Sequence, residues 1–210
     1  MRILLTALLL VACSGKSSDT SAEDGCEPTF LVATDIDETL TTSDSEWLSQ
    51  LGDPTHDPAM RPDANTLMQA YADRGYRVVY ITARGEDLGL TDGRTGREAT
   101  WDWLAAHGFP GGPEDLWLAE GIGVSGEYAV AYKSEVLLGL QGQGYTSSWA
   151  YGNADSDILA FQAAGISDER IFLVGELAGT MGVQPIVDDD AYSAHMAAQL
   201  DQVDAVGCGD

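Results

Sequence analysis

The sequence predicts a doubly wound α/β domain in which helices cover both faces of a central parallel sheet. Two observations predict this fold class. Short apolar runs alternate with longer segments of helical periodicity, which requires crossover connections and therefore parallel strands. The most informative polar residues directly follow the apolar runs, at the strand ends where ligands bind in such sheets. The chain of 210 residues is long enough for one domain with its own core.

Five short apolar runs are the expected strands. The first reads FLVA and leads into two closely spaced aspartates, and the second reads RVVYIT and ends in a threonine. The other three read DLWLA, SWAY and RIFLV. Short apolar runs of this kind are consistent with buried strands. In chain order, the expected strands cover residues 30–33, 77–82, 115–119, 148–151 and 170–174.

Five longer segments are the expected helices. In the first, Leu67, Met68 and Tyr71 share one helical face, and Gly75 follows as a stop signal. The second and third segments carry similar apolar stripes. The last segment has an acidic first turn, which suits the helix dipole. In chain order, the expected helices cover residues 61–74, 93–108, 127–141, 155–164 and 189–203.

The charge of the chain excludes one class of partner. The formal net charge is -24, and the only lysines are Lys16 and Lys133. Nucleic-acid binding depends on Lys and Arg that neutralise phosphates, so we expect no nucleic-acid partner. We also expect repulsion from anionic lipid surfaces. Any phosphate chemistry must therefore be local, supported by a metal and a few basic residues.

The first twelve residues resemble a bacterial lipoprotein signal peptide. A positively charged start precedes an apolar stretch that is too short to span a bilayer. The sequence LVAC at residues 10–13 resembles a lipobox, which implies cleavage before Cys13 and lipidation of its thiol. The following Ser14 favours outer-membrane sorting. We therefore expect an exported, lipid-anchored protein of the bacterial cell envelope; the alternative is an ordinary signal peptide with an incidental cysteine.

A polar segment at residues 13–25 is expected to be a flexible tether, which leaves residues 26–210 as the folded domain. Two cysteines then remain, Cys26 and Cys208, one near each end of the domain. In an oxidising compartment such a pair predicts a disulfide, worth roughly 4–5 kcal/mol on the loop-entropy model. The alternative is two unpaired thiols.

Two carboxylates follow the first expected strand, Asp35 and Asp37. Like charges at this spacing repel, and burial makes each carboxylate more costly to ionise. A protein retains such a pair where a cation binds, or where the two groups have different chemical roles. The sequence therefore predicts a reactive or metal-binding site at this strand end.

The two aspartates belong to a DxDxT motif, and a threonine at the end of the next strand, a lone lysine and a GNxxxD motif follow it in chain order. This order of motifs resembles the haloacid dehalogenase (HAD) superfamily of phosphotransferases. The resemblance implies an HAD-like three-layer sandwich with little or no cap domain. It also implies that Asp35 attacks phosphorus and forms an aspartyl-phosphate, while Asp37 donates and then accepts a proton. The residues that carry the resemblance are Asp35, Asp37, Thr39, Thr82, Lys133, Asn153 and Asp157.

The same resemblance implies a Mg²⁺ ion, which prefers oxygen ligands and keeps several waters. Its expected ligands are the carboxylates of Asp35 and Asp157 and the main-chain carbonyl of Asp37. The side chain of Asn153 is expected either to ligate directly or to orient a water.

Further residues are expected to bind the substrate. Thr82 and the main-chain amides after Asp35 would hold the phosphoryl oxygens, and Lys133 would offset the charge of Asp35 and the phosphate. The hydroxyl of Thr39 is expected to fix the loop of the motif. Arg84 follows Thr82 by two residues and is a further candidate for the phosphate.

A closer resemblance is to the lipin-type phosphatase domain, a magnesium-dependent phosphatidate phosphatase in lipins. It rests on the stretches DIDETLTTSD, QLGDPTHD, GYRVVYITARGEDLG and WAYGNADSDILAFQAAGISDERIFLVGELAG. Glu38 stands where the lipin pattern has Gly, and the N-terminal partner region of lipins is missing. Related domains in lipid-transfer proteins lack the second aspartate and are thought inactive, whereas this chain keeps both. We therefore expect an active phosphatase that takes a lipid phosphate and works as a monomer.

Four alternatives stay open. The stretch DIDETLTTSDSE could be a calcium loop, although a strand-like run precedes it and Leu40 replaces the required Gly. Arg84, Arg94 and Arg97 could pair with neighbouring surface carboxylates instead of a phosphate. The domain could bind lipid phosphate without turnover. It could also hydrolyse small soluble phosphoesters.

Overall fold

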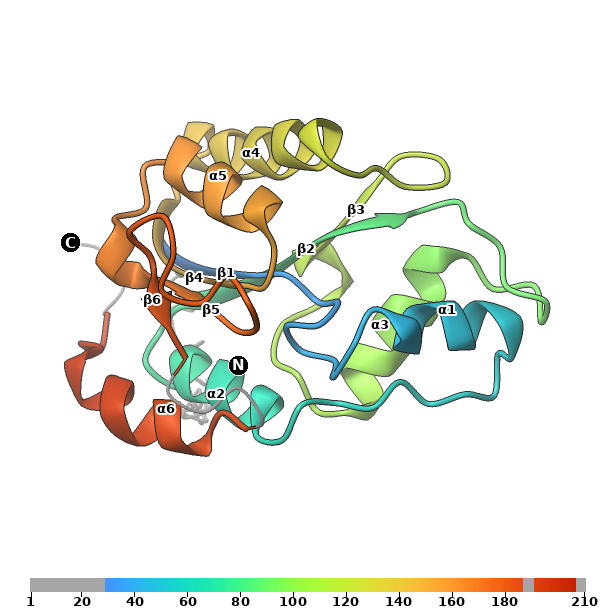
Figure 1. Cartoon of the computed structure of the whole chain (residues 1–210), viewed down its shortest axis with the longest axis horizontal. Coiled ribbons are helices and arrows are strands. Elements are labelled where there is room, and N and C mark those ends of the chain that lie inside the picture. Colours follow the sequence, from blue (N-terminus) through green and yellow to red (C-terminus); the bar gives the residue numbers. More distant parts are fainter. Residues whose placement is uncertain (1–28, 187–190, 207–210) are drawn as a thin grey trace, which may run out of the picture.

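A computed structural model describes residues 29–186 and 191–206 and confirms the predicted fold class. Six parallel strands form one sheet in the order β3-β2-β1-β4-β5-β6 (Figure 1). The strands are β1 (Phe30–Thr34), β2 (Arg77–Gly85), β3 (Leu116–Ala119), β4 (Thr146–Gly152), β5 (Ile171–Leu173) and β6 (Gln184–Pro185). The α-helices are α1 (Ser45–Gly52), α2 (Ala64–Ala72), α3 (Gly96–Ala106), α4 (Glu127–Gly142), α5 (Asp155–Ala163) and α6 (Ser193–Gln199). Single 3₁₀ turns cover Pro113–Asp115, Asp168–Arg170 and Leu200–Gln202.

The sheet separates two hydrophobic layers. Figure 1 shows α4 and α5 on one face of the sheet and α2 and α6 on the other. Within β1, Val32 packs toward α2 and α3, whereas Leu31 and Ala33 pack toward α4 and α5. This alternation is the period of two that a strand imposes on its side chains. Both faces are covered, so the central strands are apolar throughout, as parallel strands usually are.

The longest connection at the carboxyl edge of the sheet runs from β1 to α2 and contains helix α1. The others at this edge are loops, so the described residues form no separate cap domain over it. None of the helices in residues 29–186 and 191–206 has the length and hydrophobicity of a transmembrane segment. Residues 1–28 and 207–210, which include Cys13, Cys26 and Cys208, lie outside the described residues. The signal peptide, the tether, the lipidation and the disulfide therefore stay predictions.

Several element boundaries differ from those the sequence predicts. Helix α2 begins at Ala64 and not at residue 61, because Asp63 adopts a left-handed conformation with φ of 63° that no α-helix contains. The last helix, α6, begins at Ser193 and gives way to a 3₁₀ turn at Leu200. The predicted acidic start of that helix falls partly in residues 187–190, outside the described residues.

Two elements were not predicted, α1 and β6. Helix α1 spans only eight residues and buries little except Trp47 and Gln50. So short a helix is marginal on its own and depends on packing of one face against the rest of the domain. Trp47 supplies this contact, because it packs with Leu90 and Ala99 in a small cluster of its own.

A chain of buried polar side chains joins the sheet to α2 and α6. The hydroxyl of Tyr71 lies 2.8 Å from that of Tyr151, which in turn lies 3.1 Å from Nε2 of His195. Tyr192 donates a hydrogen bond of 3.0 Å to the main-chain carbonyl of Thr39. The C-terminal helix is thereby fastened to the loop that follows β1.

His195 should make the stability of the domain depend on pH. Burial lowers its pKa from 6.5 to about 4, so the folded state favours the neutral ring. The unfolded chain binds a proton below pH 6.5 that the folded chain does not bind until about pH 4. The contribution of His195 is therefore complete above pH 6.5 and is lost as the pH falls to 4, by at most about 3 kcal/mol.

Chemical denaturation of the wild type and of His195→Gln at several pH values would measure this contribution. The difference between the two free energies of unfolding should shrink as the pH falls from 7 to 4. Comparing the two proteins cancels the titration of the many carboxylates. A difference that stays constant with pH would show that His195 titrates normally in the folded state.

Candidate active site

Asp35, Lys133 and Asp157 form a buried charged cluster beneath the carboxyl edge of the sheet. Asp35 follows β1, and Lys133 reaches it from the middle of α4. Its Nζ lies 2.7 Å from Oδ1 of Asp35 and 2.6 Å from Oδ1 of Asp157. All three side chains are almost fully excluded from solvent. One ammonium faces two carboxylates here, so the cluster carries an excess negative charge.

This excess charge affects the ionisation of the cluster. Burial, opposed by Lys133 and assisted by the neighbouring carboxylates of Asp157 and Asp37, raises the pKa of Asp35 to about 7. Lys133 lies between two carboxylates, which together outweigh its own burial and raise its pKa. The ammonium is therefore firmly charged, while Asp35 would gain from one more cation nearby.

Asp157 is held in place by the start of α5. Its Oδ2 accepts hydrogen bonds of 3.0 Å from the main-chain amides of both Asn153 and Ala154. The carboxylate passes close to the backbone at Gly152, where a Cβ atom would lie 2.5 Å from Cβ of Asp157. Glycine at this position therefore lets the strand end and the helix start approach each other.

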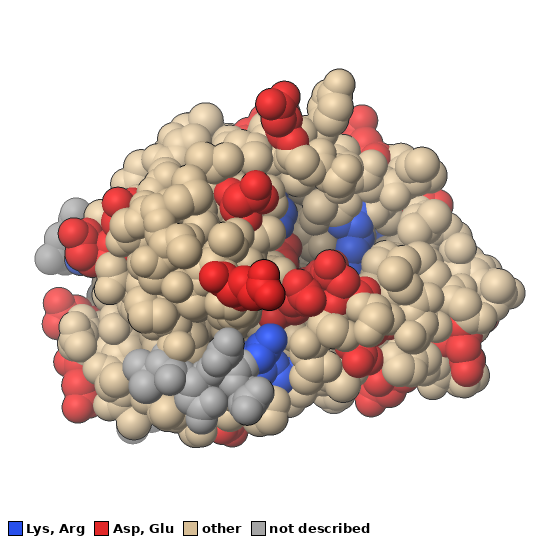
Figure 2. Space-filling view, in the orientation of Figure 1, with Lys and Arg blue, Asp and Glu red and all other residues tan. Residues whose placement is uncertain are grey.

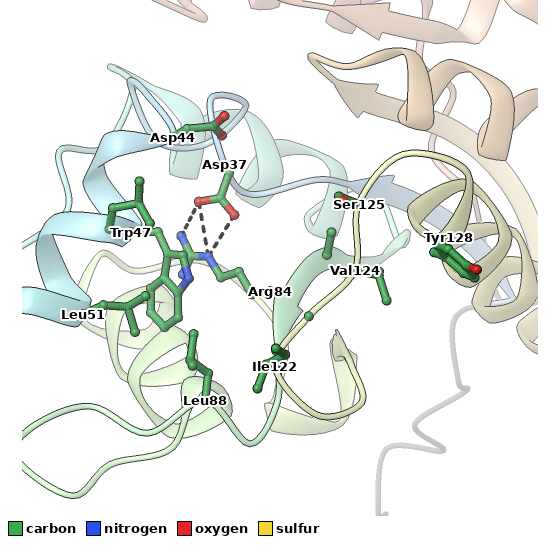
Figure 3. A pocket seen from close by; sticks show the side chains of 14 residues that line it. Asp37, Asp44, Trp47, Leu51, Arg84, Leu88, Ile122, Val124, Ser125 and Tyr128 are labelled. Carbon is green, nitrogen blue, oxygen red and sulfur yellow. Dashed lines mark hydrogen bonds and ion pairs between the residues drawn. The ribbon is translucent and has the colours of Figure 1, made fainter.

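Asp37 is held by a different partner, Arg84 of β2 (Figure 3). Nη2 of Arg84 lies 2.8 Å from Oδ1 of Asp37, and Nε lies 2.9 Å from Oδ2. Nη1 donates to the hydroxyl of Thr100 at 3.0 Å, and the guanidinium lies 4.4 Å from the centre of the Trp47 ring. Thr82 donates a weaker bond of 3.3 Å to Oδ2 of Asp37. Arg84 is therefore fixed on three sides and fixes Asp37 in turn.

The prediction that Arg84 might pair with surface carboxylates is wrong. Arg84 is buried, with 5 % of its surface exposed. The two other arginines behave as that alternative expects: Arg94 pairs with Asp92 and Asp102, and Arg97 pairs with Glu86. Arg94 and Arg97 therefore stay out of the site.

Glu38, which follows Asp37, links the loop after β1 to Asn153 after β4. Glu38 has a φ of 54°, a left-handed conformation that explains why glycine also suits this position. The carboxylate of Glu38 accepts a hydrogen bond of 2.9 Å from Nδ2 of Asn153. Arg61 donates to the main-chain carbonyls of Glu38 at 2.7 Å and of Thr39 at 3.2 Å. Three hydrogen bonds from Asn153 and Arg61 thus stabilise the left-handed turn.

The hydroxyl of Thr39 lies between Asp35, which follows β1, and Asn153, which follows β4. It is 3.5 Å from Oδ2 of Asp35 and 3.4 Å from Oδ1 of Asn153. The two acceptors are far apart in sequence, so Thr39 links the loop after β1 to the loop after β4. These contacts are compatible with the predicted role of Thr39 in fixing its loop.

The donor atoms suit a hard divalent cation such as Mg²⁺. Within residues 29–186 and 191–206, no three His, Cys, Asp or Glu side chains are grouped as a metal centre. The predicted ligand set is of another kind, because it includes a main-chain carbonyl and an amide. In the part of the chain that the structure describes, Lys133 is the one hydrogen-bond partner of Oδ1 of Asp157, so that oxygen keeps a lone pair for a cation. The groups that could hold the ion are therefore the carboxylates of Asp35 and Asp157, the main-chain carbonyl of Asp37 and the side-chain oxygen of Asn153.

Two cavities open at this edge of the sheet. The first, of about 620 Å³, contains Asp37 and Arg84 and is otherwise largely apolar. The second, of about 640 Å³, contains Glu38, Arg61 and Asn153. Asp44 lines both cavities, and its pKa is raised by burial and by its acidic neighbours. Figure 2 shows acidic side chains bordering a hollow in which basic side chains lie.

The structure brings together most of the residues that the sequence singled out. Sequence reasoning missed Arg61 and Asp44, and also Leu48 and Ile122 of the first cavity. Arg61 carried no usable signal, because its partners are main-chain carbonyls that any sequence provides. Asp35, Asp37, Thr39, Thr82, Arg84, Lys133, Asn153 and Asp157 all lie at one edge of the sheet, and their chemical roles stay predictions.

Fold and site together define a domain of the HAD-like phosphatase fold. It is similar in structure to an HAD-like phosphatase from Mesorhizobium loti, with a TM-score of 0.53 and 16% sequence identity over 80% of this chain and 84% of that one. A chain of the Pnkp1/Rnl/Hen1 RNA repair complex gives a TM-score of 0.52 at 16% identity, over 76% of this chain and 47% of that one. At such low identity these likenesses show the fold alone.

The chain belongs to the family described as the LNS2 domain of PITM 1-3, whose model matches residues 32–175. It is 26% identical over 155 residues to the protein retinal degeneration B of Drosophila melanogaster, covering 73% of this chain and 11% of the relative. It is 27% identical over 143 residues to human membrane-associated phosphatidylinositol transfer protein 3, covering 68% of this chain and 13% of the relative. The chain thus spans only about a tenth of the length of these relatives.

Proposed function

We propose that this domain is a magnesium-dependent phosphomonoesterase that works through an aspartyl-phosphate. One observation carries the proposal: the two aspartates after β1 lie in different environments. Asp35 is buried against Lys133, whereas Asp37 faces the first cavity and keeps 20% of its side chain exposed. This is the separation of roles that a nucleophile and a proton carrier require.

The proposed reaction has two steps. In the first, Oδ2 of Asp35 forms a bond to phosphorus while the bond from phosphorus to the alcohol oxygen breaks, and Asp37 gives that oxygen a proton. In the second, water attacks the same phosphorus and gives a proton to Asp37, and the bond to Asp35 breaks to leave inorganic phosphate. Oδ2 suits this role, because Lys133 engages Oδ1.

The remaining groups of the site would balance charge. Lys133 favours the ionised form of Asp35, as a bound cation would further, and faces the charge that develops on the phosphoryl group. Thr82 and the amides after Asp35 would hold phosphoryl oxygens. A Mg²⁺ ion held by Asp35, Asp37, Asn153 and Asp157 would supply further positive charge to that group.

We further propose a lipid phosphate such as phosphatidate as the substrate. Membership of the LNS2 family supports this, since relatives are named as phosphatidylinositol transfer proteins. The open edge of the sheet supports it as well, because no cap domain in the described residues would enclose a small substrate. Export, attachment to the cell envelope through Cys13 and a monomeric state belong to the same proposal.

Phosphate release tests the proposal directly. The purified protein would be given phosphatidate in mixed micelles or a small generic phosphoester, with and without Mg²⁺, and Asp35→Asn would serve as the control. We expect magnesium-dependent release that disappears in the variant. Faster release from the small phosphoester would move the substrate from lipids to soluble compounds. No release from either by the folded protein would contradict the phosphatase proposal.

A second candidate is a module that binds lipid phosphate without turnover. The observation in its favour is that Arg84 engages both carboxylate oxygens of Asp37. The names of the relatives, which describe lipid transfer, are also compatible with it. Asp37→Asn separates the two candidates: it should abolish release in a phosphatase and leave phosphatidate binding unchanged in a binding module.

A further inference from the structure

Large apolar side chains gather at the mouth of the first cavity although solvent reaches them. Leu48 is 66% exposed, Ile122 is 82% exposed and Tyr128 is 78% exposed. Among the six large hydrophobic side chains that are exposed in the described residues, these three are the most exposed, and all three line one cavity. Leu48 comes from α1. Figure 3 shows Ile122 in the loop before α4 and Tyr128 in the first turn of α4. Exposed apolar residues grouped in this way mark a binding surface.

The backbone holds this rim in place. Ile122 lies in a loop that packs directly on the end of β2, where the backbones of Gly85 and Gly123 leave no room for a Cβ atom. Val124 donates a main-chain hydrogen bond of 3.0 Å to Ala83, and Arg84 forms an isolated bridge with Gly123. An isoleucine that is 82% exposed on so tightly packed a loop is positioned by the fold.

The first cavity combines charged and apolar lining. Asp37, Asp44 and Arg84 supply its charged groups, and Trp47, Leu51 and Leu88 extend its apolar lining. The second cavity has four carboxylates and Arg61, and its large apolar side chains are Val174 and Leu177. A ligand that places a phosphate at Asp35 and Asp37 would therefore find the larger apolar lining in the first cavity. At about 620 Å³, this cavity is of the size that binds a small organic molecule.

We propose that the first cavity binds the apolar group esterified to the substrate's phosphate, and that Leu48, Ile122 and Tyr128 make the domain prefer phosphomonoesters of long-chain alcohols. The inference rests on the proposed function and deepens it. It assigns the three rim residues to the tail of a single substrate molecule. Each would bury apolar surface only when the tail is bound, so each should act on substrate affinity.

The test compares decyl phosphate with ethyl phosphate, both below micellar concentration. The variants are Leu48→Ser, Ile122→Ser and Tyr128→Ser, singly and together, and the matched control is Leu138→Ser. Leu138 is 50% exposed and also lies on α4, but it does not line the cavity. All of these side chains are exposed, so the variants should fold, which thermal melts would check.

We expect the wild type to hydrolyse decyl phosphate with a kcat/KM at least about tenfold above that for ethyl phosphate. The combined rim variant should lose about tenfold on decyl phosphate through KM, with ethyl phosphate and the Leu138→Ser control unaffected. Equal kcat/KM for the two esters, or rim variants that match the wild type, would overturn the inference and leave the proposed function standing. The rim variants could also lose activity only on decyl phosphate that is embedded in neutral vesicles. This result would assign the rim to contact with a membrane surface, and it would likewise overturn the inference.

Measuring the binding of the two esters shows whether this inference holds even if the proposed catalytic function does not. If the wild type hydrolyses neither ester, calorimetric titration of both into Asp35→Asn and into its rim variants decides the matter. Tighter binding of decyl than of ethyl phosphate, lost in the rim variants, would support the inference without catalysis. No difference between the two esters would overturn the inference as well.

Discussion

Replacing Lys133 by methionine should destabilise the domain by about 3–5 kcal/mol, a large part of the stability of a typical domain. Lys133 is the single ammonium between the buried carboxylates of Asp35 and Asp157. Methionine fills similar space but leaves both carboxylates without a counter-charge. Removing one partner of a buried ion pair costs far more than losing an exposed one, because the remaining charge cannot be hydrated.

Denaturant unfolding, followed by tryptophan fluorescence, would measure this loss, with Lys133→Arg as the variant that keeps the charge. The deficit should also depend on pH. Burial already raises the pKa of Asp35 to about 7, and removing Lys133 removes the influence that lowers it. A carboxyl whose pKa is raised by folding stabilises the folded state more as the pH falls, so the deficit of Lys133→Met should be smaller at pH 5 than at pH 8. An unfolding midpoint equal to that of the wild type would contradict the prediction.

Replacing Arg84 by methionine should lower kcat for phosphate release at least about a hundredfold, while the protein stays folded. Arg84 holds both oxygens of Asp37, and Thr100 and Trp47 hold Arg84. Without this anchor Asp37 can rotate away from the reacting oxygen. The effect on stability should be smaller, because 20% of the Asp37 side chain is exposed and water can replace the lost partner.

A double-mutant cycle with Asp37→Asn tests whether Arg84 acts through Asp37. In the Asp37→Asn background, adding Arg84→Met should cost less than about tenfold, because the group that Arg84 positions is already disabled. Arg97→Met is the matched control, since Arg97 pairs with Glu86 in a partly exposed bridge. Fully additive losses would instead mean that Arg84 contacts the substrate independently of Asp37.

Much of the fold could be predicted because the signals are local. Each of the five strands of three or more residues falls on a short apolar run, and each of α2 to α6 overlaps a segment that the sequence predicts to be helical. Asp35 follows β1, Thr82 lies in β2 and Asn153 follows β4, so all three reach the same edge of a parallel sheet. Chain order and strand direction are enough to place them together.

The weaker elements could not be predicted, for a physical reason that α1 illustrates. Eight residues with few apolar positions carry little helical signal, and the helix exists because Trp47 finds Leu90 and Ala99 across the fold. The β6 strand has only two residues and owes its place to pairing with β5. In both cases the stabilising contacts come from segments distant in sequence.

The fold class, the edge of the sheet that carries the site and the residue types available there can therefore all be inferred from local features of the sequence. Which of these residues contact one another depends on the tertiary fold. It placed Lys133 between Asp35 and Asp157, paired Arg84 with Asp37, and left Arg94 and Arg97 outside the site. Such contacts depend on the rotation of α4 and on the register of β2, which arise from packing across the whole core and leave no trace in any short stretch of the chain.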